Sequence, residues 1–500
     1  MYTNLIECLE QIAMKFPNKI VYQDENRSIT FSELVCSSKK IAMALIKEGF
    51  YKKPIVVFMD KSVKCLECFW GIIYSGNFYT PIDISMPEER IDKIVETLKP
   101  VAVISEVNDN GDMEVARIAH HVFSYEEIMK ENIIDDAITS VKKKVIDTDI
   151  LYVLFTSGST GIPKGVTITH RAVIDFAEAV CRTFTITEKD KIGNQGPFYF
   201  DLSVYDIYVP ILSGASMVII PPQHFKFPVR LLEYIRDHEI NTIFWVPSAL
   251  VLVANLRALK AVDISCLKKI MFCGEVMPNK QLNIWRKHLP DAMYVNTYGP
   301  TETTCASTYY IVDREFNDEE SLPIGRPFCN TDILLLDDDM KPVEKGMLGE
   351  ICIRGTSVSY GYYGDLQRTS ECFVQNPLNK EYIEYIYKTG DLAQYNDNDE
   401  LIYVTRKDFQ IKHMGHRIEL GEIEVAITGL EKITSCCCVY DDKRHKIVAY
   451  VTDKIENDYI QNECKKLLPN YMIPNQIIYI EQLPLNANGK VDRLKLKKML

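Results

Sequence analysis

The sequence predicts an α/β protein with a large amino-terminal domain and a small carboxyl-terminal domain. Apolar runs typical of buried strands alternate with helical stretches from Ile20 to Val295, which indicates parallel sheets covered by helices. From about Thr331 the strands are short and punctuated by glycine, which indicates a small β subdomain. A charged, polar stretch at Thr405–Gln410 then leaves about 90 residues, enough for a small α+β domain. A chain of 500 residues also exceeds what one hydrophobic core usually organises.

The amino-terminal elements follow from local patterns. Apolar spacing predicts a helix over Asn4–Phe16, and Thr30 with Glu33 has the spacing of a capping box that starts a second helix. The next expected elements are a strand at Ile20–Gln23, a strand at Ile55–Met59, a helix at Val63–Tyr74, a turn and strand at Gly76–Asp83 and a strand at Val101–Ser105.

The stretch Leu151–Val166 has the composition of a phosphate-binding loop. An apolar strand, Ile150–Phe155, leads into three glycines, four hydroxyl side chains and Lys164. Glycines let backbone amides approach a phosphate, and the hydroxyls and lysine add donors; these residues are Thr156, Ser157, Gly158, Ser159, Thr160, Gly161, Lys164 and Gly165. Lys164 is followed by glycine, so the loop is not a Walker A motif. The alternative is a mobile Ser/Gly surface loop. A helix is expected at Thr169–Phe184, and the positive end of its dipole, at its amino terminus, would help to hold the negative charge of a phosphate.

Two carboxylates, Asp201 and Asp206, lie in the aromatic and apolar run Phe198–Tyr208. An unpaired buried charge is costly, so each carboxylate needs a partner. For Asp201 the two interpretations are a cationic ligand and a helix cap.

Strands are expected at Met217–Ile220, Thr242–Val246, Lys269–Phe272 and Met293–Val295, each followed by a small or polar turn. Ligands of open α/β folds bind at the carboxyl ends of strands, so these turns should converge. The turn Asn296–Glu302 offers Tyr298 to stack on a base and Glu302 as a candidate Mg²⁺ ligand. Strands at Asp332–Leu336 and Gly349–Arg354 begin the β subdomain, and Asp391 follows in a glycine turn suited to ribose hydroxyls. Near the end of the chain, an Asn-Gly turn presents Lys490.

Composition limits the functional class. The net charge of −12 argues against a nucleic-acid-binding protein. The amino terminus lacks a signal-peptide pattern, and no apolar run approaches 18 residues, so we expect a cytoplasmic protein with no membrane insertion. The 15 cysteines are scattered without zinc spacing, so free thiols are expected.

Seven stretches in this order resemble the core motifs of the adenylate-forming superfamily, in its amino-acid-activating branch. They are the phosphate loop, Phe200–Ser203, Asn296–Glu302, Gly349–Tyr363, Tyr387–Leu392, Arg406–Glu424 and Asn488–Arg493. The resemblance implies an acetyl-CoA synthetase-like fold with a core domain at 1–405, a hinge at 406–410 and a mobile α+β lid at 411–500. It also implies the use of ATP and Mg²⁺, a small amino acid as substrate, and a separate phosphopantetheinylated carrier protein as partner.

The resemblance also implies residue roles. Thr156 and Ser157, with the glycines and Lys164, would hold the triphosphate. The adenine and α-phosphate site would contain Asn296, Thr297, Tyr298, Gly299, Pro300 and Thr301. Asp391 and Arg406 would bind the ribose with Tyr403 nearby, Glu302 would bind Mg²⁺, Asp408 would be the hinge residue, and Gly415 would border the pantetheine channel. Lys490 would be the catalytic lysine between the substrate carboxylate and the α-phosphate.

The amino-acid pocket resembles that of the D-alanine–carrier-protein ligases. Asp201 would pair with the α-ammonium, and the other lining residues would be Leu202, Tyr205, Ala249, Met271, Cys273, Thr297, Cys305 and Ala306. Cys273 matches that group, whereas Tyr205, Ala249 and Cys305 do not. Three alternatives therefore stay open: a stand-alone nonribosomal-peptide-type enzyme for another small or β-amino acid, an acyl-CoA ligase, and a non-catalytic relative. The basic residues of Lys443–Lys446 and of the tail, Lys495, Lys497 and Lys498, are candidates for carrier docking.

Overall fold

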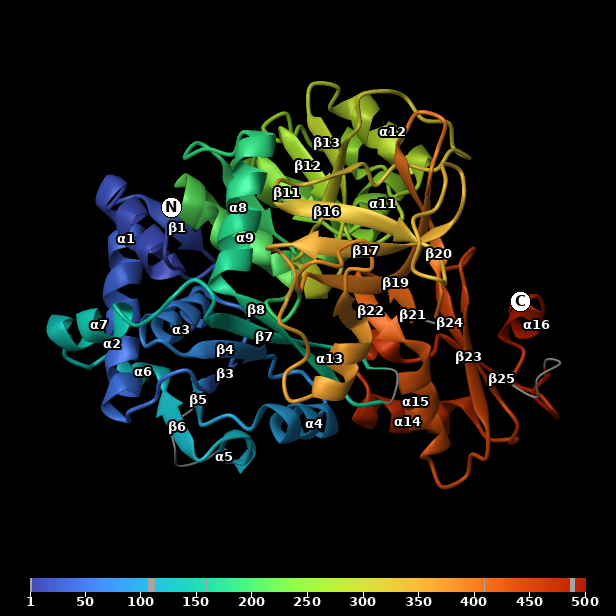
Figure 1. The fold of residues 1–500 in the computed structure, drawn as a ribbon, viewed down its shortest axis with the longest axis horizontal. Helices are drawn as coiled ribbons and strands as arrows, with labels where there is room; N and C mark the ends of the chain where they lie inside the picture. The colour runs from blue at the N-terminus through green and yellow to red at the C-terminus, as the bar shows by residue number, and fades with distance from the viewer. Residues whose placement is uncertain (1, 107–112, 159–160, 409, 486–490) are drawn as a thin grey trace. The chain divides into compact units, whose positions relative to one another are not determined.

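The computed structural model describes every residue except 1, 107–112, 159–160, 409 and 486–490 (Figure 1). The chain forms two compact units. The first comprises Met1–Ile84, Lys99–Leu154 and Val166–Thr405, and the second comprises Ser85–Leu98, Phe155–Gly165 and Arg406–Leu500. The second unit therefore contains the phosphate loop and helix α4 (Glu88–Leu98) together with the carboxyl-terminal residues.

A nine-stranded sheet in the first unit has the order β15-β14-β13-β12-β11-β9-β10-β1-β2. Its central strands are parallel and buried, as expected for runs rich in Ile, Phe and Trp that are covered on both faces. The strands are β1 (Ile20–Gln23), β2 (Ser28–Thr30), β9 (Lys191–Asn194), β10 (Ser216–Ile219), β11 (Thr242–Trp245), β12 (Lys269–Phe272), β13 (Met293–Tyr298), β14 (Thr308–Ile311) and β15 (Arg326–Pro327).

A six-stranded sheet has the order β6-β5-β3-β4-β7-β8. Its strands are β3 (Pro54–Phe58), β4 (Phe78–Ile82), β5 (Ala102–Ser105), β6 (His121–Ser124), β7 (Ile150–Thr156) and β8 (Lys164–Thr169). Strands β3, β4, β5 and β6 pair in parallel. The strands expected in the first 300 residues are thus confirmed, with ends that differ by three residues at most, at β13.

Helices α8 (His170–Phe184) and α9 (Leu202–Ser213) share the main hydrophobic core with both large sheets (Figure 1). Tyr208 of α9 shares a 2.6 Å hydrogen bond with Tyr79 of β4, and Tyr22 of β1 donates to the carbonyl of Ile207. These contacts of the middle of α9 fix the helix between the two sheets.

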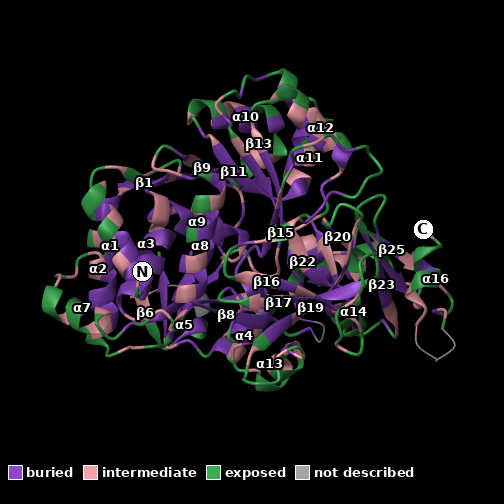
Figure 2. Cartoon of the chain, turned by 45° about the horizontal axis from the view of Figure 1, so that its top comes forward, coloured by how far each residue is buried: buried purple, intermediate pink, exposed green. Residues whose placement is uncertain are grey.

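The remaining helices of the first unit pack on the sheets; several of them, such as α1, α2 and α10, have exposed outer residues, whereas α3 is almost wholly buried (Figure 2). The capping box of Thr30 and Glu33 is present at the start of α2, as predicted. These helices are α1 (Leu5–Lys15), α2 (Phe31–Lys47), α3 (Val63–Tyr74), α5 (Met113–Ile118), α6 (Tyr125–Ile128), α7 (Asp135–Lys142), α10 (Pro228–Asp237), α11 (Pro247–Asn255), α12 (Asn279–His288) and α13 (Leu366–Cys372), with 3₁₀ turns η1 (Pro222–Lys226), η2 (Ala258–Lys260) and η3 (Thr301–Thr303).

The predicted β subdomain is a five-stranded sheet in the order β16-β17-β19-β18, with β20 paired to β19. Its strands are β16 (Thr331–Leu336), β17 (Gly349–Gly355), β18 (Phe373–Gln375), β19 (Tyr385–Tyr395) and β20 (Leu401–Arg406).

The carboxyl-terminal part of the second unit is α+β and has its own hydrophobic core, in which Ile423 and Ile460 of two helices meet Ile447 of a strand. Its elements are β21 (Gln410–His413), β22 (His416–Glu419), α14 (Leu420–Thr428), β23 (Cys436–Asp441), β24 (Lys446–Val451), α15 (Asn457–Leu467), η4 (Asn470–Met472), β25 (Gln476–Tyr479) and α16 (Arg493–Lys497).

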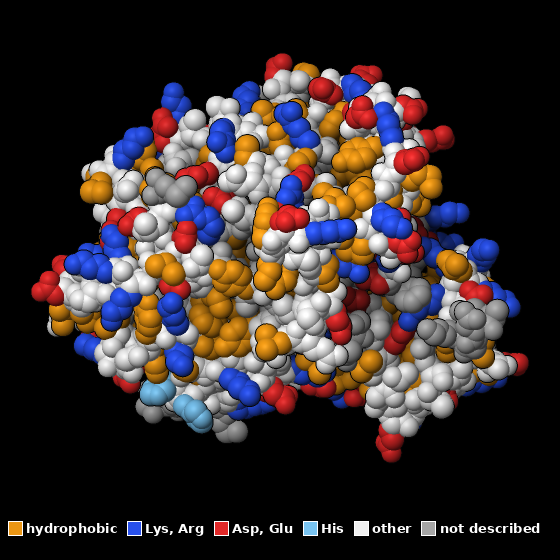
Figure 3. Space-filling model, in the orientation of Figure 1, with side chains coloured by type: hydrophobic (Ala, Val, Ile, Leu, Met, Phe, Trp, Pro, Cys, Tyr) orange, Lys and Arg blue, Asp and Glu red, His pale blue; other side chains and the backbone are white. Residues whose placement is uncertain are grey.

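All 15 cysteines are free thiols, as expected. Among the described helices, none combines the length and apolar character that a membrane crossing requires. On the face shown in Figure 3, acidic and basic side chains are interspersed.

Candidate functional site

Asp201 lies at the amino end of α9, but its side chain does not cap the helix. Its Oδ2 instead accepts a 2.6 Å hydrogen bond from the Thr301 hydroxyl, which comes from the turn after β13. The helix-cap interpretation is therefore wrong. The carboxylate is held at the carboxyl-terminal edge of the nine-stranded sheet by a residue about a hundred positions away in the chain.

Most of the residues expected to line the amino-acid pocket belong to the main hydrophobic core of the first unit. Six of them are buried members of the main core, and Ala249 packs against it; the six are Leu202, Tyr205, Met271, Cys273, Cys305 and Ala306. Burial and the nearby Asp201 carboxylate raise the pKa of the Cys305 thiol well above its ordinary value. Tyr205 packs its ring against Phe244 at 4.7 Å between centroids. Leu202, Tyr205 and Met271 are large and buried, and space filled by such side chains favours a small ligand side chain.

The turns after β11, β12 and β13 meet at one edge, as predicted. Glu275 accepts from the Ser248 amide at 2.9 Å, and the Thr297 hydroxyl donates to the Phe272 carbonyl at 3.0 Å. Asn296 is tied by its side-chain amide to the Pro323 carbonyl at 2.8 Å.

The chain between β13 and β14 is tightly constrained. A Cβ on Gly299 would lie 2.6 Å from the Ala306 Cα, so only glycine fits without moving backbone. Thr304 and Cys305 both have left-handed backbone conformations, with φ of 60° and 71°. Non-glycine residues pay for this conformation, and such strain gathers at functional sites.

Asp391 is buried, and its Oδ2 accepts a 2.6 Å hydrogen bond from the Tyr298 hydroxyl. The Tyr298 and Tyr403 rings lie 6.4 Å apart. The structure thus brings together three residues that the sequence placed at the nucleoside, from three separate stretches of chain.

Glu302 is fully buried, and its Oε1 accepts from the Tyr362 hydroxyl at 2.8 Å. No group of three or more acidic, histidine or cysteine side chains suited to a metal occurs among the described residues. Mg²⁺ keeps several waters and commonly binds one or two carboxylates together with substrate phosphates. A single carboxylate such as Glu302 therefore fits Mg²⁺ delivered with a nucleotide.

The phosphate loop continues the buried strand β7. The Thr156 Oγ1 is buried and, within the described part of the chain, has no hydrogen-bond partner, as expected for a donor reserved for a ligand. Ser157 donates to the Arg417 carbonyl at 2.6 Å, and Gly161 has φ of 78° in a turn closed onto Gly158. Lys164 is buried at the start of β8. The predicted residues Ser159 and Thr160 lie outside the described residues.

The expectation that α8 adds its amino end to the phosphate loop is wrong. Strand β8 separates the loop from the helix. The first amides of α8, from His170 and Arg171, donate to the carbonyls of Asp149 and Asp147, and the amide of Ala172 donates to the Thr169 hydroxyl. These donors are therefore already used.

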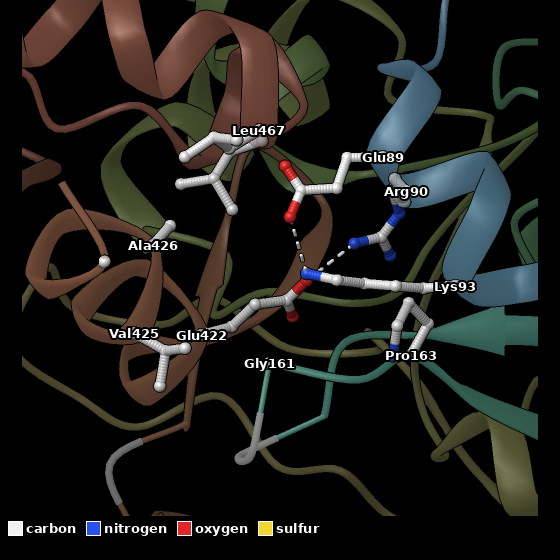
Figure 4. Close-up of a pocket in the computed structure, with 11 residues that line it drawn as sticks. Glu89, Arg90, Lys93, Gly161, Pro163, Glu422, Val425, Ala426 and Leu467 are labelled. Carbon is white, nitrogen blue, oxygen red and sulfur yellow. Dashed lines mark hydrogen bonds and ion pairs between the residues drawn. The ribbon is translucent and has the colours of Figure 1, made fainter.

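A cavity of about 290 Å³ lies in the second unit beside the loop residues Gly161 and Pro163 (Figure 4). Arg90 of α4 reaches Glu422 of α14 at 2.7 Å, and both side chains are buried. Burial raises the pKa of Glu422, although the Arg90 guanidinium and the Gly158 amide oppose this. No sequence pattern indicates this ion pair, since its members are 332 positions apart in the chain.

The other predicted residues of the second unit are only partly described. Arg406 donates to both oxygens of Asp408 at 2.6 and 2.7 Å. Burial alone would raise the pKa of Asp408, but the hydrogen bonds and charge of Arg406 outweigh it and lower that pKa. Gly415 occupies the β21–β22 hairpin loop with φ of 80°. Lys490 lies outside the described residues. Of the basic candidates for docking, Arg444 and Lys497 form ion pairs with Asp441 and Asp442.

Sequence reasoning missed Lys61, which contacts the segment before Asp201. Thr301 and Tyr362 lie within motifs of the family resemblance, but those motifs did not indicate that the two hydroxyls contact Asp201 and Glu302. The signal that did exist was Asp206, whose charge in an apolar run required a partner; the partner is the Asn194 amide, whose Nδ2 donates at 2.6 Å.

Comparison with known proteins agrees with this geometry. The model of the AMP-binding enzyme family matches residues 9–363, and that of the AMP-binding enzyme C-terminal domain matches residues 422–490. The chain belongs to the AMP-binding enzyme family. It is thereby a member of the adenylate-forming superfamily, as the motifs indicated.

Curated relatives of this AMP-binding chain fall into two groups. The D-alanine–D-alanyl carrier protein ligase of Bacillus licheniformis is 30% identical, over 99% of each chain. Tyrocidine synthase 1 of Brevibacillus parabrevis is also 30% identical, over 97% of this chain but only 44% of its own length. The chain thus spans less than half of that relative.

Solved structures confirm the fold. The adenylation domain AlmE of Vibrio cholerae, solved in complex with glycyl-adenosine-5'-phosphate, has a TM-score of 0.84 at 20% identity, with 100% of this chain and 98% of that chain covered. The o-succinylbenzoate CoA synthetase of Bacillus subtilis has the same TM-score and identity, over 99% and 98% of the two chains.

Proposed function

We propose that the protein is an ATP-dependent ligase that activates a small amino acid, with D-alanine as the first candidate, and loads it onto a separate carrier protein. The observation that carries the proposal is Asp201, a carboxylate held by Thr301 among apolar side chains. The carboxylate is partly buried and negatively charged, and the α-ammonium of an amino acid is a ligand group of matching charge. The full-length similarity to a D-alanine–D-alanyl carrier protein ligase supports the choice of substrate and acceptor.

The reaction has two steps. The amino-acid carboxylate attacks the α-phosphorus of ATP, a carboxylate oxygen–phosphorus bond forms, and pyrophosphate leaves with the electrons of the broken bond. The phosphopantetheine thiolate then attacks the acyl carbon, and AMP leaves as the thioester forms. The first step brings two anions together, so cationic groups must offset charge in the transition state.

We assign the roles accordingly. Thr156, Ser157, the loop glycines and Lys164 hold the triphosphate, whereas Asp391, Tyr403 and Arg406 hold the ribose. Lys490 bridges the carboxylate and α-phosphate, and Glu302 holds Mg²⁺, which when bound would offset phosphate charge. Asp408 is the hinge between a core of 1–405 and a lid of 411–500, and Gly415 borders the pantetheine channel. Free thiols suit a reducing cytoplasm, where we place the protein.

A second candidate is an adenylation enzyme of a peptide pathway that uses another small or β-amino acid. The equal identity to tyrocidine synthase 1 supports it. Three pocket residues depart from the D-alanine ligase pattern and would select the other amino acid: Tyr205, Ala249 and Cys305.

Pyrophosphate exchange tests the proposal across D- and L-amino acids, β-alanine, and simple acids that lack an amine. We expect exchange with a small amino acid, and its loss in Asp201→Ala. Preference for another small amino acid would favour the second candidate. Rapid exchange with simple acids would contradict the role of Asp201 and favour an acyl-CoA ligase.

A half-reaction test addresses Lys490. Lys490→Ala should lose adenylation by about two orders of magnitude or more, since a cation in the transition state is removed, while ATP binding measured by calorimetry persists. Lys498→Ala, near the same terminus, is the matched control. Undiminished adenylation would remove Lys490 from the site.

A further inference from the structure

A buried polar network in the first unit lies outside every role assigned above. Lys61, in the loop between β3 and α3, donates from Nζ to the Asn194 Oδ1 at 2.9 Å and to the carbonyls of Gln195 and Gly196 at 3.2 and 3.4 Å. Asn194, the last residue of β9, donates from Nδ2 to the Asp206 Oδ2 of α9 at 2.6 Å and to the Gly196 carbonyl at 3.2 Å. The network therefore joins a loop of the six-stranded sheet to a strand of the nine-stranded sheet and to α9.

Each member has a specific chemical fit. An ammonium has three protons, and Lys61 meets three oxygen acceptors. Burial lowers the pKa of Lys61 to about 8 and raises that of Asp206 to about 8. Within the described residues, Asp206 Oδ1 has no hydrogen-bond partner. Burying charged and unsatisfied polar groups costs free energy, and a fully connected polar network in a core holds the residues it joins in one arrangement.

The network closes on the segment that carries Asp201. Gln195 and Gly196 begin this segment, and both of their carbonyls are held by Lys61. At its far end the Ser203 hydroxyl donates to the Phe200 carbonyl at 2.6 Å, one residue before Asp201. Asp206 lies on the helix that Asp201 precedes. The segment 195–201 is thus anchored at its start by Lys61 and at its end by α9.

We infer that Lys61, Asn194 and Asp206 are positioning residues that fix the segment 195–201, and with it the Asp201 carboxylate, for recognition of the substrate ammonium. The inference rests on the proposed function for its kinetic consequence. Its structural consequence is independent: without Lys61, the segment is released from its anchor.

Two measurements on the full chain test this inference. Lys61→Met keeps an unbranched side chain one atom shorter and removes the ammonium. We expect the KM for the amino acid to rise about tenfold and the KM for ATP to stay within about twofold, because the loss falls on ground-state placement of Asp201. In the same variant, amide hydrogen exchange of a peptide covering 195–203 should become at least about tenfold faster, with the peptides of α8 unchanged. Lys53→Met, an exposed lysine on the same stretch, is the matched control.

A second pair separates positioning from folding. Asp206→Asn keeps an oxygen that can accept from Asn194 and should leave the amino-acid KM within about twofold, whereas Asp206→Leu removes it and should raise that KM about tenfold. Two results would overturn the inference. One is an equal change in the KM for the amino acid and the KM for ATP in Lys61→Met, and the other is unchanged hydrogen exchange of the 195–203 peptide in the same variant. If the wild-type protein activates no amino acid, the proposed function fails, and the exchange measurement still decides whether the network anchors the segment.

Discussion

Two hydroxyl groups hold the two carboxylates assigned to substrate binding, each at 2.6 Å: Thr301 holds Asp201, and Tyr298 holds Asp391. The two pairs share the turn after β13, although they serve different substrates in our proposal. Substitution of each hydroxyl should therefore affect a different kinetic constant.

Tyr298→Phe removes one hydrogen bond and keeps the ring. We expect the KM for ATP to rise about tenfold, since Asp391 loses the donor that orients it, with the KM for the amino acid unchanged. Initial-rate kinetics of pyrophosphate exchange, with each substrate varied in turn, measure both constants. A rise in the amino-acid KM alone would contradict the assignment of Asp391 to the nucleotide.

Thr301→Val is the complementary change at the same turn, and it keeps the shape of the side chain. It frees the Asp201 carboxylate, so we expect the amino-acid KM to rise about tenfold and the KM for ATP to change less. If both variants altered the same constant, the separation of the two sites would be wrong.

At the scale of single residues, the sequence indicated the carboxylates of the site but not the hydrogen bonds that hold them in place. Asp201, Asp391 and Glu302 could be predicted because a carboxylate in an apolar or glycine-rich setting is unusual. Lys61 could not be predicted, and neither could the contacts of Thr301 with Asp201 and of Tyr362 with Glu302, because the partner of a hydroxyl or lysine is known only once the fold is known.

The element that most constrains the site is the turn from β13 into η3, where Gly299 faces the backbone of Ala306. Gly299→Ala places a methyl group 2.6 Å from that Cα, and backbone cannot move aside cheaply. We expect a loss of about 1–3 kcal/mol in the free energy of unfolding, as for overpacking, together with weaker ATP binding. Urea denaturation and calorimetry measure the two effects.

Gly346→Ala is the control for this prediction. Gly346 has φ of 81° with open space around its Cβ position, so alanine there adds backbone strain without a clash. It should lower stability and leave ATP binding unchanged. Equal losses of ATP binding in both variants would show that the Gly299 contact is not specific to the site.

Elements were predicted well wherever a local pattern determines them. The capping box of Thr30 and Glu33 and the limits of β1, α3 and β12 follow from spacing alone. The role given to the amino end of α8 failed because hydrogen-bond partners such as the Asp149 carbonyl are set by tertiary structure.

At the scale of the whole molecule, buried His170 makes stability depend on pH. Its Nδ1 accepts from the Leu5 amide at 3.2 Å, and burial lowers its pKa from 6.5 to about 4. The unfolded chain therefore binds a proton that the folded chain does not between these values, and stability falls as pH drops from 6.5 to 4. The difference amounts to about 3 kcal/mol at most.

His170→Asn keeps an acceptor for the Leu5 amide and cannot titrate in this range. We expect its free energy of unfolding, from urea denaturation, to fall less than that of the wild type between pH 7 and pH 4.5. His416 of the second unit, whose pKa burial lowers to about 3, contributes in the same direction to both proteins and cancels in the comparison. Identical pH profiles would contradict this account.

The free cysteines also provide a chemical probe of the pocket. Cys36 and Cys329 are exposed, whereas Cys273 and Cys305 line the proposed amino-acid pocket and are buried. Alkylating reagents must reach the sulfur, so the two surface thiols should react fast and the two buried pocket thiols slowly; for Cys305, burial also raises the thiol pKa and makes the reactive thiolate rare. Cys181, Cys266, Cys372 and Cys436 are partly buried and will also react, so the labelled positions must be identified by peptide mapping. Slow labelling at Cys273 and Cys305 would then report how often the pocket opens, and a bound amino acid should slow it further.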